Sequence, residues 1–504
     1  MDTPCRPIYI QGMQATFKLS ASDRDFFRLV AKTAFSNPFT KERAQFDREL
    51  AAHEPNNATD VAVAGKRAVA KRVGDLETRD AVDMRRYAAE DQQLLRPALL
   101  YDLCNRYADA FDTYIVDDLA AGEASTPVPF AGEALQQLVA RGFAPSAACG
   151  YLALFYQMRR AHYFIDQSIL GRTAIMQDFR RRLWNNVFTH DMELYQRCLW
   201  NRMENFSTLI LGEPGTGKAA AAAAIGRSCF IPFDENKKRF ARPISRTFIA
   251  MNIAQYPGAR SEPELFGYRK DVPEGAAQKY EGVLARCCPH GAVFLDEIDE
   301  LAPAVQVMLL RVLQERTFSP VGSHERKRFQ GRLIAAVGRS PHAWLPAKEM
   351  RADFFYRLCS DRITVPSLRD RIHEDADELR PLVAQLLRRQ LGTAAPDILD
   401  RVLDALHASP GMDYAWPGNV RELGHAVRRI LLNGRYEPDA IGPEQKAFGT
   451  DNLLQSLHDG ALSAAELQAR YCALLYQRLG TYGEVARRTG LDWRTVKKYV
   501  EKGS

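Results

Sequence analysis

The sequence has few of the features that mark secreted or membrane-spanning proteins. Only 9 of its 504 residues are cysteine, an odd number without a repeating spacing, which argues against a disulfide framework. The longest uncharged run, residues 142–158, contains Gly, Pro and Gln and is shorter than the roughly 20 apolar residues of a spanning helix. The first residues, MDTPCRPIYI, lack the basic and apolar regions of a signal peptide. We therefore expect a cytoplasmic protein without a membrane partner, in which residues 142–158 form a buried helix.

The composition is that of an ordinary globular protein. Hydrophobic residues make up 46% of the chain and charged residues 26%, and the net charge of +6 is mild for this length. At roughly 150 residues per domain the length predicts about three or four domains. The cluster Cys287-Cys288-Pro289-His290 has no second ligand pair at a plausible spacing in the sequence, so a zinc site is not expected there.

Two kinds of pattern divide the chain. Residues 1–165 carry apolar residues at helical spacing and no catalytic constellation, which predicts an all-α regulatory or interaction domain. Residues 166–375 contain short apolar runs separated by helical stretches, which is typical of an α/β domain with a parallel sheet. Residues 376–440 are again helical, and residues 456–504 form a small basic helical unit. The expected strands are 208–211, 247–250, 292–295 and 333–337, and the expected helices are 23–35, 81–111, 134–141, 375–391, 396–406, 463–479, 481–489 and 493–501.

A phosphate-binding loop follows the first expected strand. The motif is G-x-x-x-x-G-K, whose glycines let backbone N–H groups surround phosphate oxygens, while the lysine places a charge near the β- and γ-phosphates. A helix that starts directly after the lysine adds its dipole to the site. The position after the lysine, where Ser or Thr usually helps to hold Mg²⁺, is alanine. The predicted ATP-binding residues are Gly212, Glu213, Pro214, Gly215, Thr216, Gly217, Lys218 and Ala219.

About 80 residues later, an apolar strand ends in two acids, Asp296 and Glu297. In phosphoryl-transfer enzymes an acid at this place holds Mg²⁺, and a second one orients or deprotonates the attacking water. We expect Asp296 to bind Mg²⁺ through water and Glu297 to act on the water. Together with the P-loop, this pair predicts an ATPase that converts ATP and water to ADP and phosphate.

Further motifs make the resemblance specific. From about residue 169 to 430 the sequence resembles the central AAA+ domain of sigma-54-dependent transcription regulators. The resemblance rests on five segments, which are Glu264-Leu-Phe-Gly267, Leu309-Leu-Arg-Val-Leu-Gln-Glu315 with Val321-Gly322, Arg351-Ala-Asp-Phe-Phe-Tyr-Arg357-Leu358, Leu368-Arg-Asp-Arg371 and Trp416-Pro-Gly-Asn-Val-Arg421-Glu-Leu423. It implies a parallel sheet with helices on both faces, a helical lid, and a bacterial protein.

The resemblance also implies roles for four residues. Arg351 and Arg357 match the arginine fingers, which reach the γ-phosphate of ATP bound to a neighbouring subunit and neutralise charge on the transferring group. Arg421 matches a sensor that reaches the nucleotide from the lid of its own subunit. Asn252 matches the residue that holds the catalytic glutamate away from water until a signal arrives. Because such a site is completed by a second subunit, the resemblance implies a ring, usually a hexamer.

The sequence departs from the family at three places. The family commonly has Glu where Ala219 stands, so the missing hydroxyl matters less than the general motif suggests. An asparagine that senses the γ-phosphate is replaced by Gly338, which predicts slow hydrolysis and weak coupling to movement. The tip of the loop that contacts sigma-54, Gly-Ala-Phe-Thr-Gly-Ala in the family, is Asp-Val-Pro-Glu-Gly-Ala at residues 271–276.

The last expected helices resemble a Fis-type helix-turn-helix. A Gly-containing turn at residues 490–492 joins two short helices, as in the DNA-binding motif. We expect this unit to bind double-stranded DNA, with Val485, Leu491, Val496 and Tyr499 in its core; a helical packing domain with a solvated basic face is the alternative. The candidate DNA-binding residues are Arg487, Arg488, Arg494, Thr495, Lys497 and Lys498.

The sequence therefore predicts an ATP-hydrolysing AAA+ transcription regulator with a DNA-binding end. Two alternatives stay open. One is a DNA-bound, ATP-dependent switch that acts by ring assembly without sigma-54, and the other is an AAA+ remodeller of another protein. RNA polymerase carrying sigma-54 is the partner that the resemblance implies, whereas the altered loop argues against it.

The altered loop leads to the first prediction. Pro273 stiffens the backbone and Glu274 places a charge where the family has an apolar anchor, and burying an unpaired carboxylate against a partner is unfavourable. We expect the wild-type protein to fail to open a sigma-54 promoter in a purified polymerase assay with ATP and a template that carries its own binding site. ATP-dependent opening that is abolished by Pro273→Ala/Glu274→Ala would show instead that the altered loop is an active one.

Overall fold

The computed structural model describes residues 16–54, 60–270, 278–338, 350–393, 396–411, 414–438 and 463–503. The altered loop at 271–276 lies outside these residues, as does most of the segment between the predicted lid and the C-terminal unit. The chain divides into two units, Met1–Arg435 and Tyr436–Ser504, and each is described by itself.

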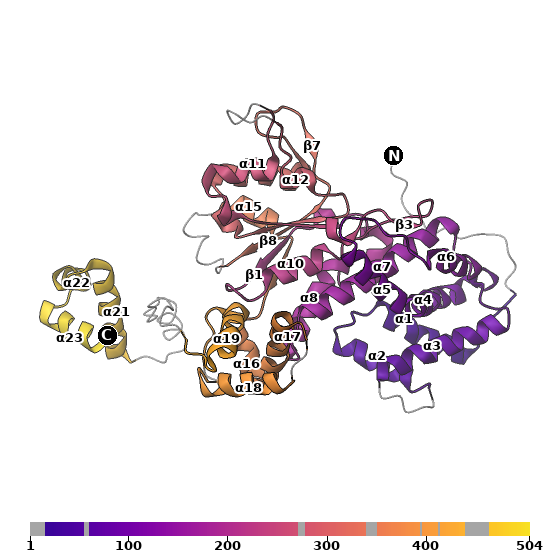
Figure 1. The fold of residues 1–504 in the computed structure, drawn as a ribbon, viewed down its shortest axis with the longest axis horizontal. Helices are drawn as coiled ribbons and strands as arrows, with labels where there is room; N and C mark the ends of the chain where they lie inside the picture. The colour runs from indigo at the N-terminus through magenta and orange to yellow at the C-terminus, as the bar shows by residue number, and fades with distance from the viewer. Residues whose placement is uncertain are drawn as a thin grey trace. The chain divides into compact units, whose positions relative to one another are not determined.

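Parallel strands form the centre of the larger unit, as the sequence predicted (Figure 1). The sheet has the order β4-β5-β8-β1-β9, and all its pairings are parallel. Strands β1, β5 and β8 are buried on both faces, which explains their continuous apolar sequences. The strands are β1 (Thr208–Leu211), β4 (Phe248–Asn252), β5 (Ala292–Asp296), β8 (Arg332–Val337) and β9 (Asp361–Thr364).

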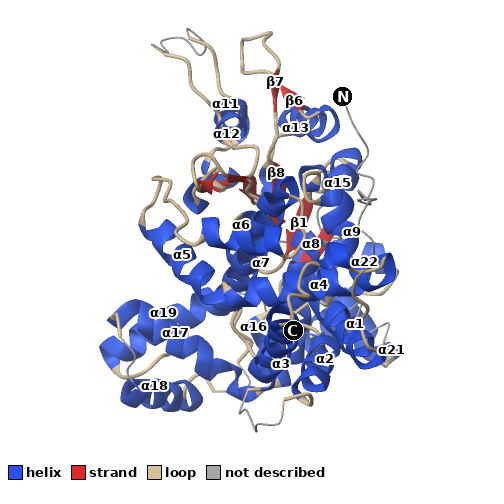
Figure 2. Ribbon diagram, turned by 90° about the vertical axis from the view of Figure 1, so that its right-hand side faces the viewer, coloured by secondary structure: helices blue, strands red, loops and turns tan. Residues whose placement is uncertain are grey.

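Helices cover both faces of this sheet, which confirms the predicted layers (Figure 2). Alternate residues of β1, Ile210 on one side and Leu209 with Leu211 on the other, belong to two different hydrophobic clusters. One cluster includes α8 (Ala174–Phe188) and α10 (Lys218–Gly226). The other includes α11 (Ser261–Phe266), α12 (Val283–Arg286), α13 (Pro303–Glu315) and α15 (Ala352–Leu358). Short hairpins, β2 (Phe233–Asp234) with β3 (Arg239–Phe240) and β6 (Thr317–Phe318) with β7 (Lys327–Arg328), lie outside the sheet.

The N-terminal segment is all-α, as predicted. Its long helix α7 (Pro145–Ser168) covers residues 145–158 of the uncharged run and packs against α10, which lies on the parallel sheet. The buried side chains of both regions form one cluster, in which Tyr156 of α7 stacks on Phe240 with ring centroids 3.9 Å apart. The other helices are α1 (Ala21–Phe35), α2 (Lys41–Ala51), α3 (Val61–Thr78), α4 (Ala89–Arg106), α5 (Ala108–Ala120) and α6 (Ala131–Ala140). The expected single helix at 81–111 is thus two helices with a short 3-10 turn before them.

A helical subdomain follows the sheet, and we call it the lid. It comprises α17 (Leu379–Leu391), α18 (Pro396–Ala408) and α19 (Asn419–Asn433), and α16 (Leu368–Glu374) leads into it. Gly392 adopts the left-handed conformation after α17, with φ of 74°, and ends that helix.

The C-terminal unit is a three-helix arrangement of α21 (Ala464–Leu479), α22 (Tyr482–Thr489) and α23 (Trp493–Gly503). A capping box between Ser463 and Glu466 starts α21. Gly490, with φ of 72°, makes the turn between α22 and α23. Val485 and Val496 are fully buried in the core, and Leu491 and Tyr499 are partly buried and pack against it.

Candidate nucleotide-binding and hydrolysis site

The predicted P-loop connects the carboxyl end of β1 to the amino end of α10. Gly217 adopts the left-handed conformation with φ of 106°, directly before Lys218 begins the helix. The first N–H groups of a helix have no partner within it and face outward, so this end of α10 is suited to bind phosphate.

Gly215 lets the lid approach the P-loop closely. Its φ is +79°, and a Cβ atom at this position would lie 2.2 Å from the carbonyl oxygen of Gly418 and 2.9 Å from the Cβ of Arg421. Any side chain would therefore push the lid away. The contact places Arg421, at the start of α19, beside the loop, where the family resemblance put a nucleotide sensor.

Lys218 is buried at the base of the loop. Its ammonium group donates hydrogen bonds to the carbonyl oxygens of Gly212 at 2.8 Å and Glu213 at 3.1 Å. Burial lowers the pKa of Lys218, and the negative charges of Asp296 and Glu297 oppose that shift. The three side chains that the sequence predicted for phosphate, magnesium and water thus interact electrostatically in the fold.

The two acids lie where β5 ends. Asp296 is the last strand residue, and its carboxylate accepts a hydrogen bond from the N–H of Glu297 at 3.1 Å. Burial raises the pKa of Asp296, whereas the charge of Lys218 lowers it. Glu297 has φ of 55° and ψ of 48°, a left-handed conformation that costs a non-glycine residue roughly 1–2 kcal/mol. Strain of this kind often marks a functional position.

Asn252 lies next to the acids on the neighbouring strand. It ends β4 and pairs with Asp296 in the sheet register. Its side-chain oxygen accepts a hydrogen bond from the N–H of Ala254 at 2.9 Å. The fold therefore brings Asn252 beside the acidic pair, and in the described residues no hydrogen bond joins it to Glu297.

The two candidate arginine fingers belong to another part of the fold. Arg351 lies directly before α15 and is bound to Asp353 through its Nε at 3.0 Å and its Nη2 at 2.8 Å, with about half of its side chain exposed. Arg357 donates a hydrogen bond to the carbonyl of Leu313 at 3.3 Å. Within the described part of the chain, neither arginine bonds to the P-loop of its own subunit.

A bridge between P-loop and lid was missed by the sequence analysis. Arg369 of α16 donates to the carboxylate of Glu213 at 2.9 Å, and Asn419 donates to the same carboxylate at 3.1 Å and to the carbonyl of Pro214 at 3.1 Å. Asn419 is fully buried and also accepts a hydrogen bond from the N–H of Leu368 at 2.8 Å. We call Glu213, Arg369 and Asn419 the P-loop–lid bridge. The sequence signal was the distinctive motif at 416–423, which contains Asn419 but does not indicate its partner.

A second link ties the segment before α8 to the lid. Arg371 and Glu378 form a buried ion pair with an Nη2–Oε1 distance of 2.7 Å. Glu378 also accepts a hydrogen bond from the N–H of Arg172 at 2.8 Å, and Arg371 donates to the carbonyl of Leu170 at 2.8 Å. The segment before α8 is thereby held against the residues that lead into the lid.

Gly338 follows β8 and occupies the predicted sensor position. Leu211 pairs with Val337 in the register, so Gly338 lies beside the start of the P-loop. A Cβ built on Gly338 would meet no atom of the described residues within 4 Å, and its φ lies outside the left-handed range. The position therefore has room for a side chain, although the sequence supplies none.

The candidate DNA-binding side chains lie mainly on the exposed surface of α22 and α23. Arg488, Lys497 and Lys498 are exposed, and Thr495 is half-buried. Arg487 is exposed and pairs with Glu484 of its own helix, and the guanidinium of Arg494 lies 5.6 Å from the ring centroid of Trp493. The unit thus presents a basic surface around the start of its third helix.

The strand–P-loop–helix unit, the strand-terminal acids and the adjoining helical lid define a P-loop ATPase domain of the AAA+ class. Residues 188–364 match the family model of the sigma-54 interaction domain. Residues 188–364 are therefore similar to the sigma-54 interaction domain, in agreement with the resemblance seen in the motifs.

Curated proteins with similar sequences include three bacterial regulators. The chain is 32% identical over 252 residues to regulatory protein AtoC of Escherichia coli K12, which is 49% of this chain and 50% of that protein. It is 34% identical over 292 residues to transcriptional regulatory protein ZraR of Escherichia coli O157:H7. The aligned region covers 58% of this chain and 62% of that protein. It is 33% identical over 351 residues to the Nif-specific regulatory protein of Azotobacter vinelandii. The aligned region covers 68% of this chain and 60% of that protein. The chain thus spans about half to three fifths of these relatives.

Among solved structures, the chain is similar to NtrX from Brucella abortus in complex with ADP. The similarity has a TM-score of 0.40 and 19% sequence identity, and it covers 74% of this chain and 80% of that one. In the described residues, no helix is long and apolar enough to cross a membrane.

The open space at Gly338 generates a prediction about the rate of hydrolysis. Gly338→Asn should fit without strain and supply an amide near the γ-phosphate, so we expect ATP turnover to rise roughly tenfold or more. Gly338→Ala adds a Cβ without the amide and is the matched control. Phosphate release at saturating ATP measures the effect, and equal rates for the two variants would contradict the proposed role of this position.

Proposed function

We propose that this protein is an ATP-hydrolysing AAA+ transcription regulator that assembles into a ring and binds double-stranded DNA through its C-terminal unit. The observation that carries the proposal is the joining of P-loop and lid at Gly215, Asn419 and Arg421. It puts the nucleotide-binding loop and the segment that resembles a sensor of nucleotide state in direct contact.

In this proposal the P-loop binds the phosphates of ATP. Gly215–Lys218 supply backbone N–H groups, and the ammonium of Lys218 exchanges its carbonyl partners for phosphate oxygens. Asp296 would hold Mg²⁺ through water, because its partly buried carboxylate at a strand end can accept hydrogen bonds from that water. Bound Mg²⁺ supplies neutralisation of phosphate charge. Glu297 orients and deprotonates the attacking water.

The ring follows from the arginines of α15. Among the described residues, neither Arg351 nor Arg357 bonds to the chain's own P-loop, and the guanidinium of Arg351 pairs with the half-exposed carboxylate of Asp353. In a ring, these side chains reach the γ-phosphate on the neighbouring subunit and stabilise charge in the transition state. We propose a hexamer, in line with the family resemblance.

Hydrolysis is coupled to movement through the P-loop–lid bridge. Burial would raise the pKa of Glu213, but the hydrogen bonds from Arg369 and Asn419 lower it overall, so the carboxylate stays ionised and bound. A change in P-loop conformation on phosphate release then moves α16 and α19 with it. Asn252, beside Asp296, regulates when Glu297 meets water.

The relatives are named as regulators, which supports control of transcription as the output. Such a protein acts in the bacterial cytoplasm. The sequence of the contact loop at 271–276 favours a second candidate, a DNA-bound switch that changes its assembly with ATP and does not grip sigma-54. Remodelling of another protein partner is the third.

The shared active site can be tested by mixing variants. Lys218→Ala should abolish ATP binding, and Glu297→Gln should bind ATP but fail to hydrolyse it. Lys218→Ala and Arg357→Ala proteins should each be inactive, yet their mixture should regain part of the activity, because some interfaces combine an intact P-loop with an intact finger. Arg401→Ala, in the lid helix α18, is a control that should leave turnover unchanged.

Binding of a radiolabelled nucleotide measures ATP affinity, and phosphate release measures hydrolysis. Wild-type ATP affinity in Lys218→Ala would refute the P-loop assignment. A mixture with no more activity than its components would argue against arginine fingers supplied by a neighbour.

DNA binding generates a separate prediction. Arg494 lies at the start of α23, where side chains meet base edges in a helix-turn-helix, whereas Lys498 lies farther along the helix and suits phosphate. Arg494→Ala should cost about 1–3 kcal/mol and relax preference at one base position, and Lys498→Ala should weaken binding to all sequences alike and flatten the salt dependence. Mobility shifts with the full-length protein on genomic fragments measure both effects, and the absence of any shift at low salt would exclude this role.

A further inference from the structure

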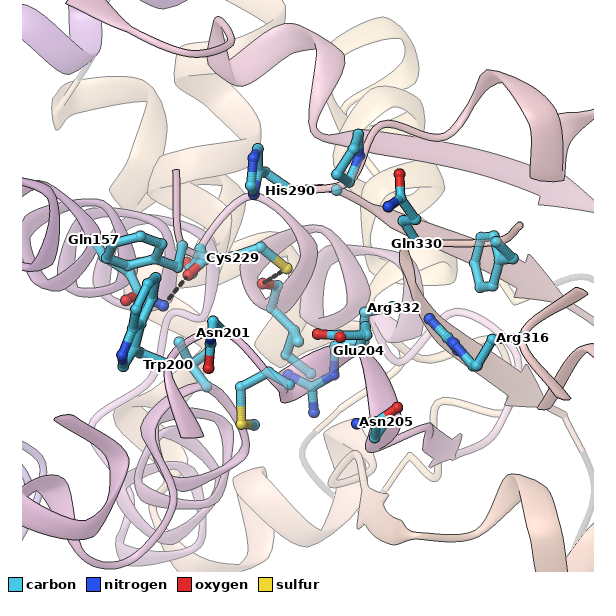
Figure 3. Close-up of a pocket in the computed structure, with 18 of the residues that line it drawn as sticks. Gln157, Trp200, Asn201, Glu204, Asn205, Cys229, His290, Arg316, Gln330 and Arg332 are labelled. Atoms are coloured by element: carbon cyan, nitrogen blue, oxygen red, sulfur yellow. Dashed lines mark hydrogen bonds between the residues drawn. The ribbon is translucent and has the colours of Figure 1, made fainter. Parts of the chain in front are cut away.

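A cavity of about 230 Å³, whose lining residues are drawn in Figure 3, lies at the edge of the sheet opposite the P-loop. Its lining includes Asn205, Gly291 and Arg332, which lie at or just before the starts of β1, β5 and β8. Because these strands are parallel and the P-loop follows the carboxyl end of β1, the cavity and the proposed ATP site lie at opposite ends of the strands. The cavity is therefore a separate site.

Positive charge dominates the lining of this cavity. Three arginines, Arg316, Arg328 and Arg332, stand against one carboxylate, Glu204. Arg332 is only 3% exposed, and its guanidinium donates to neutral acceptors, among them the carbonyl oxygens of Phe206 and Asn186, each at 2.9 Å. Among the described residues, none of the three arginines forms an ion pair. Three cations that face one carboxylate leave a net positive charge in the cavity, so an anion there would be stabilised.

A preorganised polar wall faces these arginines. Gln157 of α7 is 1% exposed, and its amide donates to the carbonyl of Ser228 at 2.9 Å and accepts from the hydroxyl of Tyr195 at 2.8 Å. Tyr195 begins a π-helical turn, Tyr195–Leu199, a conformation found frequently at functional sites. The turn brings Trp200 against Phe230, with ring centroids 4.7 Å apart, beside the cavity.

The same wall holds the carboxyl end of the P-loop helix. Arg160 of α7 is fully buried and donates to the carbonyls of Arg227 and Cys229, each at 2.7 Å, just beyond the last turn of α10. Ser228 and Cys229 also line the cavity. Helix α10 is nine residues long and starts with Lys218, so a shift at one end is transmitted to the phosphate-binding end.

We propose that this cavity binds a small organic anion that carries carboxylate or phosphate groups, and that its binding changes the rate of ATP hydrolysis through α7 and α10. At about 30 Å³ for each water in the liquid, the cavity has room for roughly seven or eight waters, which is the size of a small metabolite. Anion binding is independent of the proposed function, whereas control of hydrolysis rests on it.

Calorimetry on the full-length protein tests binding, with ADP saturating so that the P-loop is occupied. Citrate and 3-phosphoglycerate are the anionic probes, and glycerol is the uncharged control. We expect at least one anion to bind, and Arg316→Gln to weaken its affinity about tenfold. Arg401→Gln, which removes the same charge on α18 away from the cavity, should bind like wild type. The probe that binds distinguishes carboxylate from phosphate recognition.

Two further measurements keep the proposal falsifiable. Thermal unfolding checks that the Arg316→Gln protein is folded. If it is not, Arg328→Gln, a substitution at an exposed position, replaces it. We expect Arg328→Gln to weaken the affinity for the anion a few-fold. Trp200 fluorescence should change on binding, and Trp200→Phe should remove that change. No heat from either anion at millimolar concentration, or equal affinities for wild type and the Arg316→Gln or Arg328→Gln protein, would overturn the site. Binding without any effect on ATP turnover in an active protein would overturn the coupling alone.

Discussion

The close contact between a glycine of the P-loop and the backbone of the lid is the constraint on which the rest of the site depends. Gly215 has no side chain, and this allows the close approach. A Cβ atom at this position would lie only 2.2 Å from the carbonyl oxygen of Gly418. This approach lets Asn419 bond to the same loop and brings Arg421 beside it. The loop that we propose binds phosphate therefore cannot change shape independently of the lid. An AAA+ ATPase needs this coupling to convert hydrolysis into movement.

Helix α10 is held at both of its ends by different parts of the chain. Its amino end follows the P-loop, which the Glu213 carboxylate ties to α16 and α19. Its carboxyl end is bound by Gln157 and Arg160 of α7. The N-terminal helices and the core share one hydrophobic cluster, so they are attached directly to the nucleotide site and not through a loose linker. A signal received by the N-terminal segment therefore has a short physical route to Lys218.

The chemistry of the site could be predicted from short, contiguous motifs. The P-loop lies on a strand–turn–helix and the two acids lie at a strand end, because each motif is a run of neighbours whose backbone pattern is local. The sequence analysis missed strand β9 because the strand lacks an apolar run. It has only four residues, and two of them, Asp361 and Arg362, are charged and exposed. The π-helical turn at Tyr195–Leu199 was also missed, since nothing in five residues distinguishes it from an α-helix.

The sequence by itself determined which chemical groups are present and the local structures that carry them: the P-loop after β1, the acids after β5, the glycine at the sensor position and the basic C-terminal helices. Tertiary structure decided which distant groups meet. Glu213 bonds to residues 156 and 206 positions away, and Arg332 bonds to carbonyls 126 and 146 positions away. Such partners share no local pattern, because they are brought together only when the sheet, the lid and the N-terminal helices pack. The P-loop–lid bridge and the cavity at the amino ends of the strands were therefore decided by the fold alone.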